Sequence, residues 1–408
     1  MIDEDDGRTA QVARVASDLR GALTPLLAAP AGTPSRPIRL TRELGLDKSL
    51  ASRLVQACRA EADPEFLHTV PSPTGLRILL ERARRGADAK LLERAAHAVD
   101  AFDNLIASMP GGRQALDALM GEGSSTIRER REQMARQASF KAQSFLFGHY
   151  CETLATALFI VPSADAGRVD VLEVHRRLGL HRLSPSAALP LLSVLPRAPA
   201  PAADDDGPCM ADLRGDPRAS RPEDFIVADA SSAPLPTVRV DRDGALTTFV
   251  LDPGDDVRLP ARLTTAFRVL RADTVEQTAA YNVVRNYMLH TPCRTLVRDV
   301  FVARGLWPDA TPQVGFYLPG PSGTPMVAIE PGKPHLRRVN LTARIEQLPD
   351  GEAGFDLAGV EDQRPAIAGT LGAAGLDPAA FRGWRCRMAY PVPLIEMQVA
   401  MRFSGRGS

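Results

Sequence analysis

Residues 38–58 contain the feature that most limits the fold, because their apolar side chains are spaced for two short helices joined by a tight turn. Gly45 lies at the corner, where glycine takes a positive φ at little steric cost and lets the first helix end. Asp47 follows as an N-cap whose carboxylate accepts from the free N–H groups of the second helix. The stretch is therefore predicted to form a helix-turn-helix. Its apolar positions are Leu40, Leu44, Leu46, Ala51, Leu54 and Val55.

The outer face of the second helix carries side chains that reach phosphates and base edges in a DNA major groove. They are Lys48, Ser49, Ser52, Arg53 and Gln56. Arg42, near the end of the first helix, and Arg77, in a later helical stretch, are further candidate DNA contacts. The alternative is an ordinary helical hairpin whose charges form a solvated face. Because the turn, the cap and the basic face agree, we favour DNA binding.

This pattern resembles the DNA-reading unit of bacterial winged-helix regulators of the IclR and MarR type, whose helix-turn-helix often runs Glu-Leu-Gly-Leu-x-x-Ser-x-x-Ser-Arg-Leu. The resemblance is confined to the N-terminal part of the chain. It implies a transcriptional regulator that binds double-stranded DNA sequence-specifically as a homodimer. The matching residues are Glu43, Leu44, Gly45, Leu46, Ser49, Ser52, Arg53 and Leu54.

Length and charge limit how such a unit is used. A chain of 408 residues more often forms two or three domains than one. The formal net charge is zero, so any surface for nucleic acid must be a local patch. Five scattered cysteines indicate reduced thiols, and neither a basic and apolar leader nor a long apolar window is present. We therefore expect a cytoplasmic protein without a membrane segment.

The N-terminal third is predicted to be helical. Helical spacing recurs over residues 9–28, 75–85 and 88–109, and residues 66–75 occupy the place of a wing without showing a clean strand pair. A long helix over residues 126–154 turns from charged to apolar, which suits a connector or a dimer contact as well as a plain buried helix. The expected domains are a helical head, with or without a wing, at 1–122 and a connector at 123–154.

Residues 155–408 are expected to form an α+β domain that dimerises or senses a ligand. Short β-branched runs at 156–161 and 168–174 predict strands, and Asp241 to Gly244 is a hairpin signal. Residues 172–195 faintly repeat the helix-turn-helix pattern, although Pro185 and Pro190 oppose it. The segment 197–208 has the composition of a flexible loop. Helical spacing returns over 274–290, and several strand candidates follow.

Enzyme signatures are absent from the sequence, so we expect no catalytic residues, no cofactor and no metal. The run His149-Tyr-Cys-Glu is predicted to hold a buried structural thiol on a helix, and His175 and His181 with Asp170 and Glu173 lack ligand spacing. Tyr281, Asn282 and Arg285 form a polar row for a small-molecule effector. The alternative function is a scaffold protein whose helical head docks a protein partner.

Overall fold

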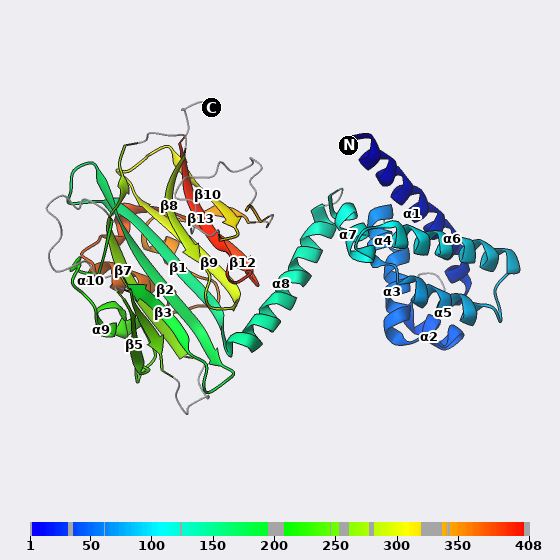
Figure 1. Cartoon of the computed structure of the whole chain (residues 1–408), viewed down its shortest axis with the longest axis horizontal. Helices are drawn as coiled ribbons and strands as arrows, with labels where there is room; N and C mark the ends of the chain where they lie inside the picture. The colour runs from blue at the N-terminus through cyan, green and yellow to red at the C-terminus, as the bar shows by residue number, and fades with distance from the viewer. Residues whose placement is uncertain are drawn as a thin grey trace. The chain divides into compact units, whose positions relative to one another are not determined.

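The computed structural model divides the chain into two compact units, residues 1–132 and 133–408. It describes residues 2–31, 36–60, 62–122, 125–194, 208–244, 246–252, 261–276, 281–319, 337–339, 341 and 343–403. Helices dominate the first unit and strands the second (Figure 1). The predicted combination of helices and strands in an α+β chain is confirmed at the level of class.

Unit 1 is a bundle of helices around one apolar core. Helix α1 contributes Val12, Val15, Leu19 and Leu23 to this core, at the spacing predicted from the sequence. The longest interior helix, α6, packs along α1 and buries Val99. The helices are α1 (Ile2–Ala31), α2 (Pro37–Leu44), α3 (Lys48–Cys58), α4 (Asp63–Thr69), α5 (Pro73–Ala83), α6 (Ala89–Ser108) and α7 (Gly112–Glu122).

The place of the predicted wing is helical, so the winged alternative is wrong for the described part of unit 1. Residues 63–69 form α4, and α5 starts at Pro73. Proline suits the first turn of a helix, because the N–H that it lacks has no partner there. Ser72 caps α5, with its hydroxyl accepting from the Gly75 N–H at 3.3 Å. These capping signals outweigh the short apolar run that precedes them.

The long helix ends earlier than predicted. Helix α8 spans Ser125–Phe147, and strand β1 (His149–Pro162) begins two residues later. Gly148 between them has a φ of 70°, and a side chain there would meet Ala187 and Ser184. From His149 onward the chain pairs with β2 (Arg168–Arg182) and β9 (Cys293–Ala303). Strand β9 is far away in the sequence, so the spacing of residues 149–154 could not reveal this pairing.

A seven-stranded mixed sheet forms the centre of unit 2, in the order β11-β12-β9-β1-β2-β7-β4, with β1 and β9 parallel. Two three-stranded sheets accompany it, β10-β13-β8 and β3-β6-β5. The remaining bounds are β3 (Leu189–Val194), β4 (Cys209–Ala211), β5 (Val238–Asp243), β6 (Leu246–Leu251), β7 (Ala261–Thr274), β8 (Tyr281–Met288), β10 (Ala310–Tyr317), β11 (Ile345–Gln347), β12 (Phe381–Ala389) and β13 (Glu396–Phe403), with α9 (Pro222–Phe225), α10 (Gln363–Ala373), η1 (Ala228–Ala230), η2 (Gly351–Phe355) and η3 (Pro378–Ala380).

Both faces of the large sheet are covered by apolar contacts. On one face, Phe159 and Phe301 pack with Phe355 of η2 and Ile367 of α10. On the other face, Leu158, Val300 and their neighbours meet Val399 and Met401 of β13. A sheet buried on both sides reads as a near-continuous apolar run, which is the pattern of β1.

The helix expected near the start of the C-terminal strands is wrong. The described residues of the stretch 274–290 form no helix: β7 ends at Thr274, and 281–288 form strand β8, paired with β13. The second helix-turn-helix that Pro185 and Pro190 opposed is not formed, because the described residues 172–194 form most of β2 and all of β3. The hairpin at Asp241 to Gly244 is confirmed, because β5 and β6 pair across it. The predicted flexible segment 197–208 lies outside the described residues, apart from its last position.

Among the described residues, no helix combines the length and the apolar character needed to cross a membrane.

Candidate functional site

The predicted helix-turn-helix is formed by α2 and α3. Gly45 ends α2 in the left-handed conformation, with φ 63° and ψ 28°. The Asp47 side chain then accepts from the Ser49 N–H at 2.8 Å and the Leu50 N–H at 2.9 Å. These bonds satisfy two of the N–H groups that a helix start leaves without partners. Gly45 and Asp47 therefore perform the two roles predicted for them.

The inner side of this motif is packed as its apolar spacing requires. Leu40, Leu46, Ala51, Leu54 and Val55 are buried in the core of unit 1, and Leu44 packs against it partly exposed. Burial of these side chains on α2 and α3 determines which side of each helix faces outward. The polar residues of α3 consequently lie on the surface.

The outer side of α3 presents the five side chains predicted to contact DNA. We call Lys48, Ser49, Ser52, Arg53 and Gln56 the α3 face, and all five residues are exposed. Their spacing places them along one stripe of the helix. The Arg53 Nη2 is 3.5 Å from the Val70 carbonyl oxygen, a long contact that holds the guanidinium only weakly.

The two further arginines lie in different surroundings. Arg42 is on α2 with 85% of its side chain exposed, and its Nε is 4.0 Å from Glu43. Arg77 is on α5, where its Nη2 is 3.1 Å from Asp100 and 2.7 Å from Asp103 of α6. Two carboxylates already balance the charge of Arg77, so we leave it out of the surface proposed below.

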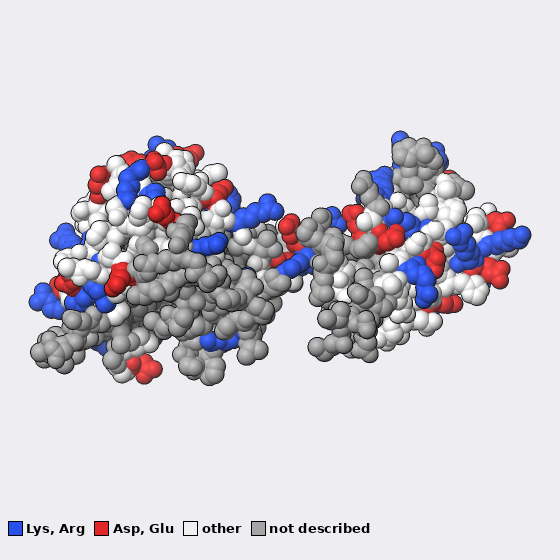
Figure 2. Space-filling model, turned by 90° about the horizontal axis from the view of Figure 1, so that it is seen from above, with Lys and Arg blue, Asp and Glu red and all other residues white. Residues whose placement is uncertain are grey.

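The segment around the motif carries a local excess of positive charge, although the whole chain is neutral. Between Arg36 and Arg59 there are six Lys or Arg residues and two Asp or Glu residues. On the face visible in Figure 2, Lys and Arg are interspersed with Asp and Glu in both units. The segment that holds the motif is thus more basic than the chain as a whole, which suits contact with a polyanion.

Asp47 limits how a phosphate approaches α3. Its hydrogen bonds to the Leu50 N–H and to Ser49 keep the pKa of this carboxyl below its usual range, so it is ionised at neutral pH. The N–H groups that otherwise attract phosphate at a helix start are occupied. Side chains along the α3 face, rather than the helix start, must therefore make any contact with nucleic acid.

The predicted effector residues Tyr281, Asn282 and Arg285 lie on strand β8. The helical row in which they were expected to stand together does not exist. Their side chains lie outside the described part of the structure, so a ligand site there remains a prediction.

The His149-Tyr-Cys-Glu run lies on a strand, which corrects the helix expected there. Cys151 is buried and is the register partner of Cys293 on the parallel strand β9. Burial and the neighbouring Cys151 raise the pKa of the Cys293 thiol well above its usual value. A thiol that stays protonated is a poor nucleophile. Cys151 is fully buried, as the sequence predicts for this thiol.

A buried charged cluster in unit 2 was not predicted from the sequence. Glu173 accepts from the ring of His175 at 2.9 Å, and the Arg298 Nη1 is 3.5 Å from the same carboxylate. Arg298 also lies over the Tyr287 ring at 5.3 Å. Glu173, His175 and Arg298 are each less than 9% exposed. Charged residues inside strand-like runs were the available signal, but their pairing depends on strand register.

Metal binding finds no support in these groups. Among the residues that the structure describes, no three His, Cys, Asp or Glu side chains come together as metal ligands. Asp170 accepts from the Arg271 N–H at 2.8 Å, and His181 is 3.3 Å from Glu152. Both are used in contacts within the sheet.

Comparisons with known proteins identify no family. No family model matches the chain, and no curated protein matches it. Among solved structures, it is similar to a suggested protease from Parabacteroides distasonis ATCC 8503, at 10% identity and TM-score 0.28, covering 63% of this chain and 41% of that one. It is also similar to an M1 zinc metallopeptidase from Deinococcus radiodurans, at 8% identity and TM-score 0.23, covering 62% and 42%. The chain spans about two fifths of these proteins, and likenesses this weak support no conclusion about activity.

Substitution of Gly45 tests the turn. A Cβ there meets nothing within 4 Å, so the cost of Gly45→Ala comes only from the positive φ. We expect the free energy of unfolding of unit 1 to fall by about 1 kcal/mol. Urea denaturation followed by circular dichroism at 222 nm measures this change. Gly45→Asn should lose less, because asparagine tolerates this conformation, and equal stability of all three chains would contradict the assignment.

Acid should destabilise unit 2 through its buried histidines. Burial lowers the pKa of His149 from 6.5 to about 4, and burial also lowers that of His175. The unfolded chain therefore binds protons near pH 6.5 that the folded unit excludes, and the free energy of unfolding falls as the pH drops below 6.5. The expected slope is up to about 1.4 kcal/mol per pH unit for each histidine.

Tryptophan fluorescence during urea denaturation at pH 7.5, 6.0 and 5.0 measures this slope, since both tryptophans lie in unit 2. His149→Gln should reduce the slope by the contribution of one histidine, because one fewer proton is bound on unfolding. His97→Gln, an exposed position in unit 1, should leave it unchanged. A stability that does not vary over this range would show that these imidazoles titrate normally.

Proposed function

We propose that the chain is a DNA-binding regulator whose unit 1 places α3 in the major groove of a DNA duplex. The observation that supports this proposal is the exposed α3 face behind a turn fixed by Gly45 and Asp47. An α-helix fits the width of the major groove, where base edges present their donors and acceptors. In this proposal, residues 1–122 act as the reading head.

The α3 face offers two kinds of contact. Lys48 and Arg53 carry positive charge to phosphates or to the acceptor edge of guanine, while Ser49, Ser52 and Gln56 form neutral hydrogen bonds with bases. Arg42 adds charge near the end of α2. Contacts to phosphates give affinity and salt dependence, whereas contacts to base edges give sequence preference.

Two copies of the chain are part of the proposal. A single helix-turn-helix contacts few base pairs, so pairing two heads increases affinity and the length of sequence read. We propose that unit 2 supplies the dimer contact or senses an effector, with α8 as the connector between the two functions. The symmetry of a dimer would then require an operator with two matching half-sites.

Removal of the two charges on the α3 face tests the proposal. The full chain is used to select duplexes from a random-sequence pool, and the selected duplex is then titrated by fluorescence anisotropy at several salt concentrations. Lys48→Ala with Arg53→Ala should weaken binding about tenfold at low salt and make the salt slope shallower by about one for each of the two side chains that contacts a phosphate.

Arg82→Ala is the matched control, since Arg82 is an exposed arginine of unit 1 outside the α3 face. It should leave both the affinity and the salt slope unchanged. No enrichment of any duplex, or equal binding by the double variant, would reject the role of α3 in DNA recognition.

Docking of a protein partner is the second candidate function, and an exposed apolar residue on the motif favours it. Ile38 on α2 is 75% exposed, so its side chain is accessible to a protein that docks on this motif. Under this alternative, a protein that stays bound through nuclease treatment of the purified chain should be lost on Ile38→Ser. Retention of that protein by the variant, or binding of nucleic acid alone, would count against it.

A further inference from the structure

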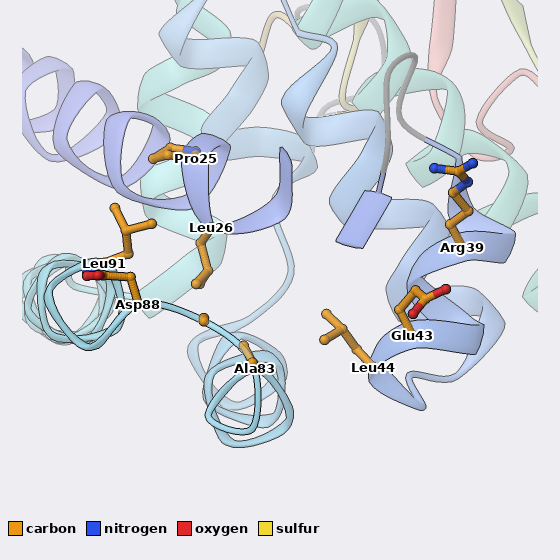
Figure 3. A pocket seen from close by; sticks show the side chains of 10 residues that line it. Pro25, Leu26, Arg39, Glu43, Leu44, Ala83, Asp88 and Leu91 are labelled. Atoms are coloured by element: carbon orange, nitrogen blue, oxygen red, sulfur yellow. The ribbon is translucent and has the colours of Figure 1, made fainter. Parts of the chain in front are cut away.

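A pocket of about 390 Å³ lies in unit 1 on the inner side of the helix-turn-helix. Residues of α1, α2 and α5 line it, together with the turn from α5 into α6 and the first residues of α6. Figure 3 shows Leu26 of α1 and Leu44 of α2 pointing toward its middle, with Arg39 and Glu43 on successive turns of α2 at one side. Its volume is at the lower end of the range for small-molecule sites, about 300–1,000 Å³.

The pocket combines an apolar interior with charged groups at its edge. Leu26 is 3% exposed, and Leu44 and Leu91 are partly buried. Arg39 and Glu43 are both exposed and lie one helical turn apart on α2. An apolar body of a ligand would therefore be shielded from water while its polar end stays near the opening.

The charged groups at the edge of the pocket differ in whether they already have hydrogen-bond or ion-pair partners within the protein. Asp88 accepts from the N–H groups of Lys90 and Leu91 at 2.8 and 3.3 Å, so its carboxylate is occupied as the cap of α6. Glu43 is 4.0 Å from the Arg42 Nε, a loose contact. The described part of the chain gives the Arg39 side chain no hydrogen bond or ion pair. Arg39 and Glu43 are thus an available donor and an available acceptor on the same side of α2.

We infer that this pocket binds a small zwitterion with an apolar side chain, the chemistry of an apolar α-amino acid. The guanidinium of Arg39 takes the carboxylate, and Glu43 takes the ammonium group. The side chain of the ligand packs against Leu26, Leu44 and Leu91. A ligand that carries only one of the two charges leaves one group of the pair without a partner and binds less tightly.

Such a ligand would change DNA binding through the position of α2, and this effect depends on the proposed function. It joins α2 to α1 and to the turn between α5 and α6, so it stabilises the position of α2 seen here. Because α2 packs against α3, a ligand that holds α2 in this position changes the affinity for DNA when DNA binding shifts α2.

Isothermal titration calorimetry of the full chain tests the site without any DNA. The probes are leucine, methionine and phenylalanine, with 4-methylpentanoate and 3-methylbutylamine as analogues of leucine that lack the ammonium or the carboxylate. We expect at least one amino acid to bind with one site per chain. Each single-charge analogue should bind about tenfold or more weakly than leucine, the cost of one charged hydrogen bond.

Conservative variants identify which group holds which charge. Arg39→Gln should remove the preference for leucine over 3-methylbutylamine, and Glu43→Gln should remove the preference for leucine over 4-methylpentanoate. Both positions are exposed, so neither change threatens the core, and Arg82→Gln serves as a control outside the pocket. No heat with any of the three amino acids at about 10 mM, a concentration that detects affinities down to the millimolar range, or preferences unchanged in both variants, would overturn the inference.

The same titrations repeated with the selected duplex separate this inference from the proposed function. If an amino acid binds but no duplex does, the pocket stands and the DNA-binding proposal fails. If a duplex binds but no amino acid does, the pocket inference fails alone.

Discussion

The two hydrogen bonds from backbone N–H groups to the Asp47 carboxylate determine where α3 begins, and everything proposed for unit 1 depends on that start. A helix that began one residue later would turn its surface by about 100°. Leu50, Leu54 and Val55 would then leave the core, and the polar stripe would turn away from solvent. Gly45 lets the chain turn from α2 into α3, because its positive φ is one that other residues adopt only at an energetic cost.

Unit 1 was largely predictable because its signals are local. Asp47, Ser72 and Asp88 each accept from N–H groups two or three residues later, so a capping residue and the helix that it starts lie within one short stretch of sequence. The polar α3 face follows from the same periodicity. The sequence left a winged and an all-helical head open, and residues 63–83 form the capped helices α4 and α5.

Unit 2 was predictable only as a class. Strand pairing depends on partners far away in the sequence. Residues 149–154 and 281–288 have helical spacing, but they form strands because they pair with β9 and β13 respectively. The charged residues of β2 show the same limit. Arg176 donates to Gln363 at 2.6 Å and Glu173 meets Arg298, contacts that rest on α10 and β9 respectively. Neither contact leaves a local pattern, which is why the buried cluster was missed.

The parallel pairing of β1 with β9 has a consequence for how the protein is made. The first central strand, which contains Cys151, emerges from the ribosome long before its partner strand, which contains Cys293. Helical contacts in unit 1 are local and form early, whereas this pairing must wait for most of the chain and close a long loop. During translation, β1 is therefore exposed for a time before β9 is made. Because β1 is apolar along most of its length, a chaperone that binds it would be most useful in this interval.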